Sequence, residues 1–321
     1  MDGISPMDDA EKKRGSSLRD ALARGDAALA GIQPILSHLL SAPDHSLFSD
    51  EIVARVRGMI ADLANQILRA QAESTGENGR DAFAVRHAEA LGEHLQASCE
   101  LLSHCHALAV EWQVTERLEA EFGLDPVLSP LMQRMIADAD GWVSSGAMAA
   151  LAAQARFVQS QRRMELPIAE LPGDLFHRTL LNWREYCGEG QSEAVTRAET
   201  KLRAGFDEGA GRLALLSRLV SALGERAQGA LAIEEAGSGL FFTALANLSS
   251  QPRGLAVLSS HARQAVRFAL GLRAAGMQAA QIDETLLMLH PSGAPVAGLA
   301  DIGEREARTL LASSSEGFGA R

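Results

Sequence analysis

Residues 87–112 read HAEALGEHLQASCELLSHCHALAVEW, the part of the chain richest in side chains that can bind a metal or carry out redox chemistry. The stretch holds four of the nine histidines and two of the three cysteines, namely His87, His94, His104, His106, Cys99 and Cys105. Imidazole and thiolate are ligands that zinc and other transition metals prefer. The stretch therefore raises the hypothesis of a metal or redox site.

The spacing of these residues argues against a site built by this stretch alone. The apolar periodicity predicts one helix over residues 87–112, and ligands on one helix meet only at spacings of three or four. His87 and His94 would share an edge of that helix but lie about 10 Å apart along its axis. Cys99 and His106 would share a second edge with the same separation. Neither pair is expected to bind one ion.

The remaining histidine of the stretch has a separate direction on the predicted helix. His104 would point to the same side as Glu111 and form an exposed i,i+4 pair with Glu100. A metal site would then need ligands from a second element, and the candidates are His177 and Cys187. The sequence does not show whether either of them approaches the stretch.

The favoured interpretation of residues 87–112 is structural. Between the two edges runs a stripe that we predict to be buried, made of Ala88, Leu91, Leu95, Leu102 and Ala109. Buried cysteines beside such a stripe act as small hydrophobic residues. We therefore predict no catalytic residue, no metal and no cofactor. The alternative is a metal site, whose candidate ligands are His87, His94, Cys99 and His106.

Sequence motifs of common enzymes do not occur elsewhere in the chain. There is no HExxH, no GxSxG and no Gly-Lys-Ser/Thr loop. The paired glycines of GSGLFF and GEGQ do not follow a strand pattern, which a phosphate-binding loop would require. Whether the chain is an enzyme stays open, and the absence of these motifs favours a protein without catalytic activity.

The composition and periodicity predict an all-α fold. Hydrophobic residues make up 46% of the chain but aromatic residues only 4%. This composition favours packed helices over sheets. Apolar residues recur at spacings of three and four, most clearly at Ile52, Val56, Met59, Ile60, Leu63 and Ile67. We expect a multi-helix array, built either from HEAT-like stacked helical hairpins or from two packed helical bundles.

The segment MELPIAELPGD, with two prolines and a glycine, is the best candidate for a boundary between helical regions. The predicted organisation is a disordered arm at 1–16, an N-terminal helical region at 17–163, a linker at 164–173, a C-terminal helical region at 174–312 and a disordered tail at 313–321. The first fifteen residues contain no apolar core, so they do not form a signal peptide.

Charge and cysteine usage limit the classes of partner. The net charge of −11 argues against nucleic acid, which needs a basic surface. A helix-turn-helix in RAAGMQAAQIDETLLMLHP would place Asp283 and Glu284 on its second helix, with no Arg or Lys there. No apolar run is long enough to cross a membrane. Three cysteines, an odd number, indicate reduced thiols and a cytoplasmic location.

Three stretches of the chain resemble a known family. They are HSLFSDEIVARVRGMIADLANQIL, MELPIAELPGDLFHRTLLNWREYC, and the region from AIEEAGSGLFF to RQAVRFALGLRAAGMQAAQIDETLLMLHP. Together they resemble the alphaproteobacterial domain-of-unknown-function family 2336 over most of residues 17–312. The resemblance implies a helical, HEAT-like cytoplasmic protein without a known activity, and it carries over no catalytic residue.

Two functions follow from these observations. The first is a non-catalytic helical scaffold or regulatory adaptor that binds another protein, with the acidic balance favouring a basic partner segment. The second is a helical enzyme or metal-dependent sensor that uses residues 87–112. Neither function involves nucleic acid or a membrane.

Overall fold

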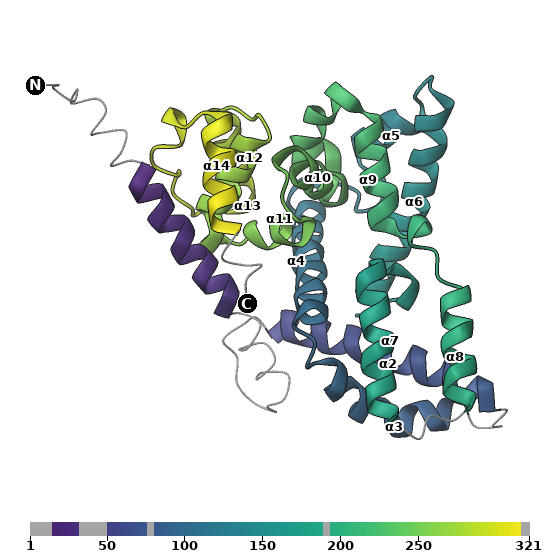
Figure 1. Ribbon diagram of the computed structural model, residues 1–321. Coiled ribbons are helices and arrows are strands. Elements are labelled where there is room, and N and C mark those ends of the chain that lie inside the picture. The colour runs from purple at the N-terminus through teal and green to yellow at the C-terminus, as the bar shows by residue number, and fades with distance from the viewer. Residues whose placement is uncertain (1–14, 32–49, 76–79, 189–192, 316–321) are drawn as a thin grey trace, which may run out of the picture.

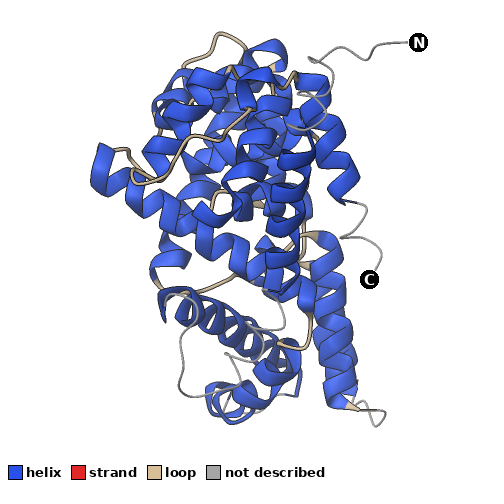
Figure 2. Ribbon diagram, turned by 90° about the vertical axis from the view of Figure 1, so that its left-hand side faces the viewer, coloured by secondary structure: helices blue, strands red, loops and turns tan. Residues whose placement is uncertain are grey.

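The structure is a computed structural model that describes residues 15–31, 50–75, 80–188 and 193–315. Every regular element of these residues is a helix (Figure 2), which confirms the predicted all-α multi-helix array. A first helix covers residues 15–31. The α-helices that follow are α2 (Asp50–Thr75), α3 (Arg80–Leu95), α4 (Cys99–Phe122), α5 (Pro130–Ile136), α6 (Gly141–Arg162), α7 (Gly173–Cys187), α8 (Glu193–Ala204), α9 (Arg212–Ala222), α10 (Ile233–Ser249), α11 (Arg253–Ser259), α12 (Ala265–Ala274), α13 (Ala279–Leu289) and α14 (Glu304–Ser315). Short 3-10 helices are η1 (Ile168–Glu170), η2 (Glu208–Ala210), η3 (Gly224–Leu231), η4 (Ala262–Gln264) and η5 (Leu299–Asp301).

One end of the molecule is built around α2, at the bottom of Figure 1. This helix packs against α3 and α8, and α3 in turn packs against α7. The apolar stripe predicted for α2 is confirmed, since its six residues are at most 5% exposed: Ile52, Val56, Met59, Ile60, Leu63 and Ile67. Serine is a preferred N-cap residue, but Ser49, just before α2, lies outside the described residues.

The central element is α4, which joins this end to the other (Figure 1). It contacts α2 below and α10 and α11 above, and it is buried on most of its surface. Its indole Trp112 is 1% exposed and meets the ring of Phe157 edge to face. Because α4 is surrounded, polar side chains on it must find partners within the protein.

The upper part of Figure 1 holds the remaining helices. The pairs α5–α6, α6–α9 and α9–α10 pack on one side of α4, and α12 packs against α13 and α14 on the other. The helix over residues 15–31 joins this second group through Asp26, whose carboxylate accepts from Arg267 on α12. Gln264 also donates to the carbonyl of Gly25.

The segment between the two predicted regions is not α-helical. Helix α6 ends at Arg162, Met164 adopts a φ of 57°, and α7 begins after Pro172. The turn at Met164 lies against Gly58 of α2, where an added Cβ would be 2.7 Å from the Met164 Cβ. Helices from both predicted regions share one core, because α7 packs on α3 and α8 on α2.

The ends of the chain extend the helical part slightly beyond the predicted limits. Residues 15 and 16, expected in the arm, begin the first helix, and residues 313–315, expected in the tail, belong to α14. Residues 1–14 and 316–321 lie outside the described residues. Within the described ranges, no helix is both long and apolar enough to cross a membrane.

The helix predicted over residues 87–112 is divided in two, because α3 ends at Leu95 and α4 begins at Cys99. Asp125 and Pro126 are residue types that favour a helix start, but α5 starts at Pro130, after the N-cap Ser129. The Asp125 carboxylate accepts from two backbone N–H groups in the preceding turn, so it caps that turn and not the helix.

Candidate functional site

The histidine- and cysteine-rich stretch is divided by a tight turn at residues 96–98. The Ser98 hydroxyl accepts from the backbone N–H of Leu101, which caps the start of α4. The chain therefore changes direction between His94 and Cys99, and helical-wheel positions calculated for one continuous helix do not hold across the turn. The prediction of a single helix was wrong for this reason.

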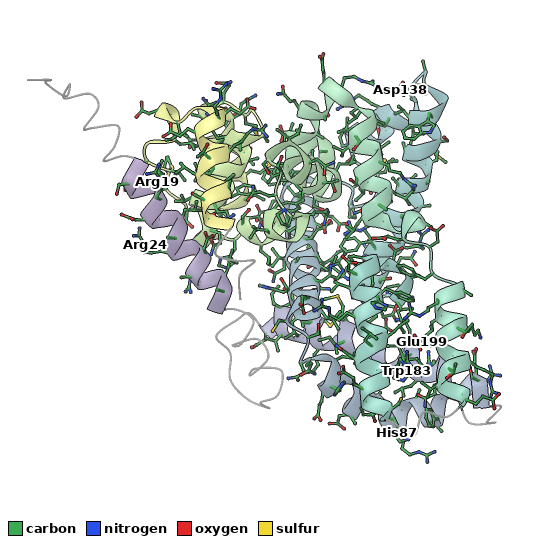
Figure 3. All side chains as sticks on the ribbon, viewed as in Figure 1. Arg19, Arg24, His87, Asp138, Trp183 and Glu199 are labelled. Carbon is green, nitrogen blue, oxygen red and sulfur yellow. The ribbon has the colours of Figure 1, made fainter. Side chains whose placement is uncertain are left out.

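The candidate ligands on α3 lie beside aromatic rings and α7. His87, near the bottom of Figure 3, is half-buried with its ring centroid 4.7 Å from that of Phe83. The His94 Nε2 lies 4.0 Å from a carboxylate oxygen of Glu185, and its ring centroid is 6.0 Å from that of Tyr186. Helix α7 is thus the element that approaches the stretch.

The candidate ligands on α4 and α7 differ in exposure and in the residues that they contact. Cys99 is exposed, whereas Cys105 and His106 are buried. His177 is exposed and its Nδ1 lies 3.2 Å from Arg203. Cys187 is half-buried. Among the described residues, no three His, Cys, Asp or Glu side chains are arranged to hold a metal ion.

Burial also makes the buried members of the stretch unreactive near neutral pH. Desolvation raises the pKa of the Cys105 thiol to about 12, so the nucleophilic thiolate is scarce. Desolvation, with a smaller contribution from His261, lowers the pKa of His106 to about 4. These two side chains fill the core in their neutral forms.

His104 does not form the exposed pair with Glu100 that its spacing predicts. Glu100 instead binds Arg178 of α7 at 2.6 Å. The buried Nε2 of His104 has no hydrogen-bond partner within the described ranges. Burial, followed by the charges of Arg253 and Arg212, lowers the pKa of His104 to about 4. The prediction was wrong because α4 turns this side of the helix toward α11.

The same side of α4 holds a buried ion cluster that the sequence analysis missed. Glu111 is fully buried and binds Arg212 of α9 through two hydrogen bonds, of 2.8 and 2.9 Å. Arg253 of α11 binds the same carboxylate, also at 2.8 and 2.9 Å. The available signal was the run ALAVEW, where a carboxylate among apolar residues needs buried partners.

The charges and hydrogen-bonding groups of the Glu111 cluster find their partners within the cluster and among its neighbours. Burial alone would raise the pKa of Glu111, but the two guanidinium groups hold it well below its usual range. Gln154 accepts from Arg212 at 3.1 Å, and Thr243 accepts from Arg253 at 3.0 Å. The neighbouring cavity, of about 20 Å³, has room for about one water molecule. We therefore assign the cluster a role in joining α4, α9 and α11.

A larger cleft, of about 310 Å³, opens between η3, the start of α10 and α13. Its apolar floor includes Leu231 and Met277, which are 2% and 8% exposed. Its rim carries the exposed carboxylates Glu234 and Glu284. Half-buried Met288 also lines it. The volume falls at the lower end of the range for ligand sites.

Local sequence fixes the shape of this cleft. Gly276 has a φ of +98° and lets the chain turn between α12 and α13, where an added Cβ would lie 2.9 Å from the Gln228 amide. Gln278 and Gln281 form a capping box that starts α13. The lining residues include two carboxylates but no Lys, Arg or His. The cleft is therefore suited to a group with a cationic end and an apolar stem.

Comparisons with protein-family models, curated proteins and solved structures yield no match for this chain. The resemblance to family 2336 therefore stays a prediction.

Proposed function

We propose that the protein is a non-catalytic helical adaptor that binds an arginine- or lysine-bearing segment of another protein in the cleft between η3 and α13. The observation that carries this proposal is the pair of exposed carboxylates, Glu234 and Glu284, above an apolar floor. A net charge of −11 would add long-range attraction for a basic segment.

The chemistry of an arginine or lysine side chain matches the cleft. The long aliphatic stem can lie on Leu231 and Met277 while its charged end reaches the rim. Arginine fits better than lysine because its planar guanidinium can form paired hydrogen bonds with a carboxylate. Exposed rim charges mainly guide association and partner choice, so the apolar contacts must supply much of the affinity.

The alternative of a helical enzyme or metal sensor finds less support in the same geometry. The suspected ligands are distributed over α3 and α4 with a turn between them, and the buried thiol of Cys105 is neutral near pH 7. The Glu111 cluster is strongly charged, but the cavities beside its members Arg212 and Gln154 each hold only about 20 Å³. These observations favour a binding role.

The proposal can be tested with a phage-displayed random peptide library selected on the immobilised protein. We expect the enriched peptides to share an arginine or lysine next to an apolar residue. Synthetic copies should bind in solution, and Glu284→Lys should weaken them roughly tenfold, about 1.4 kcal/mol. Added salt should also weaken binding, because the rim is exposed.

A matched control is available in the same region of the surface. Glu225→Lys makes the same charge change on η3, but Glu225 is exposed and does not line the cleft. It should leave peptide affinity within about twofold, less than 0.5 kcal/mol. Selection of peptides without a cationic residue, or equal loss from both variants, would contradict the proposal.

A further inference from the structure

Helix α6 presents an uncharged face to solvent at the outer edge of the array (Figure 1). Its buried side packs against α5 and α9. On the opposite side, Trp142 is 63% and Met148 is 51% exposed, and both rank among the few large apolar side chains left uncovered in the described part of the chain. Residues 142–155 contain no charged residue. Tryptophan and methionine are enriched, and charged residues depleted, at the centres of protein interfaces, so this face has the composition of an interaction surface.

Six exposed residues of α6 follow a seven-residue repeat. Positions seven apart begin at Trp142 and continue with Ala149 and Arg156, and a second row three residues later holds Ser145, Ala152 and Gln159. All six are exposed. Two rows with this spacing form the seam through which one helix packs on another. A partner helix is therefore the best match to the face.

We propose that this face binds a second copy of the chain, with the two α6 helices antiparallel about a twofold axis at the level of Ala147. In this register Trp142 of one copy lies over Ala152 of the other, and Ser145 lies opposite Ala149. A large side chain at one end of the face thus meets a small one at the other end, twice. Such self-complementarity is what a twofold interface requires.

Charge at the two ends of the face favours the same arrangement. Asp140 caps the start of α6 and is exposed, and Asp138 lies just before it (Figure 3), paired with Arg226 at 2.8 Å. Arg156 lies four turns along, and its ion pair with Glu170 in the described part of the chain is long, at 3.5 Å. Antiparallel docking brings each Arg156 to the acidic end of the other copy. Parallel docking would instead place like charges together.

The contact is expected to be weak but functional. One helix face buries less than the ~1,200 Å² of total surface that stable complexes bury, so association should depend on concentration in the micromolar range. None of the residues that line the cleft at η3 and α13 lies on α6. Each copy would keep its cleft open, and the dimer would offer two of them to a partner.

The first test is sedimentation velocity of the full chain over a wide range of concentration. We expect a reversible monomer–dimer equilibrium. Ala152→Glu, which places a carboxylate under Trp142 of the second copy, should weaken dimerisation at least tenfold. The control Ala90→Glu adds the same charge to an exposed alanine of α3 and should change nothing. A wild-type chain that stays monomeric throughout overturns the proposal.

The second test uses disulfide cross-linking to measure the register of the two α6 helices. In a chain with Cys99→Ser and Cys187→Ser, two single variants are made, Ser145→Cys and Ala149→Cys. Mixed together and oxidised, they should form a disulfide between copies, because facing Cα atoms come within about 7 Å. Each variant alone should cross-link poorly, since its two cysteines are offset by about 6 Å along the axis. Equal cross-linking of unmixed variants, or a dimer unaffected by Ala152→Glu, also overturns the proposal.

Discussion

The strongest test of the structural reasoning is the substitution Glu111→Gln, which keeps the shape of the side chain and removes its charge. The carboxylate of Glu111 is the shared acceptor for both guanidinium groups, and Arg212 is only 3% exposed. A neutral amide offers one acceptor oxygen and directs its NH2 group at a donor. The buried guanidinium of Arg212 and the half-buried guanidinium of Arg253 would then lack a counter-ion.

The expected cost follows from the burial of the two arginines. Breaking a buried ion pair by removing one partner typically costs about 3–5 kcal/mol. Arg253, with its side chain 16% exposed, can turn partly toward water, whereas Arg212 cannot, so we expect a value near the lower end of that range. Against a typical total stability of about 5–15 kcal/mol, this loss is large.

Equilibrium unfolding in urea, followed by circular dichroism, measures the change directly. The control is Glu100→Gln, which removes the 2.6 Å pair with Arg178, where both side chains are 54% exposed. This exposed pair should contribute at most about 1 kcal/mol. If Glu111→Gln lowers the free energy of unfolding no more than its control does, the charge of Glu111 does not stabilise the fold as we argue.

Three further predictions concern histidines, a helix contact and metal content. Stability should fall as the pH drops from 6.5 to about 4, because the unfolded chain binds protons that His104 and His106, with folded pKa values of about 4, do not. Each contributes up to about 1.4 kcal/mol per pH unit, and His104→Leu should reduce the slope in pH-dependent urea unfolding; an unchanged slope would contradict the burial argument. The lowered pKa of Glu111 acts mainly below this window, since the stability that its charge contributes declines only as the pH falls below 4.5. Gly58→Ala should lower the thermal midpoint, at a cost of about 1–3 kcal/mol, because the new methyl meets Met164 at 2.7 Å; Gly92→Ala, with nothing within 4 Å, should not lower it. Protein purified without a histidine tag should contain metal well below one atom per chain by elemental analysis and keep its helicity after chelation, and a stoichiometric metal would refute this.

The sequence predicts the helices better than their limits. The stripe from Ile52 to Ile67 locates α2 because an amphipathic period persists through a long helix. The turn at residues 96–98 escapes prediction because it contains no glycine or proline, and apolar residues continue at helical spacing on both sides of it. Leu95 and Leu102 are both buried although they belong to different helices.

The Glu111 cluster could not be assigned from sequence because its members are far apart along the chain. Arg212 and Arg253 lie in segments that read as ordinary amphipathic helices, where arginine normally faces solvent. Only the packing of α11 on α4, and the hydrogen bonds from Arg212 at the start of α9 to Glu111, show that these two arginines face inward. The cleft was missed for a similar reason, since Glu234 and Glu284 come together only through the fold.

Buried arginines also link helices elsewhere in this fold. Their role in fixing how the helices pack can be tested separately from their effect on stability. Arg55 donates to the Gln161 carbonyl at the end of α6, and Arg267 joins the first helix to α12 and α14 through Asp26 and Ser314. Helix faces rich in Ala and Leu can shift relative to one another at a small cost in free energy. A shift that separates a buried charge from its partners costs much more, so a paired buried charge favours one packing.

Removing one member of the Glu111 cluster and removing all of its charged members should therefore have different effects on stability. The triple variant Glu111→Met, Arg212→Leu, Arg253→Met leaves no unpaired charge, so its free energy of unfolding should be within about 1–2 kcal/mol of wild type or above it. If the cluster fixes the packing of α4, α9 and α11, amide exchange in these helices should nevertheless become faster and the unfolding transition broader. A triple variant as unstable as Glu111→Gln would show instead that the ion pairs themselves stabilise the fold, and unchanged exchange would show that packing is fixed by the apolar core.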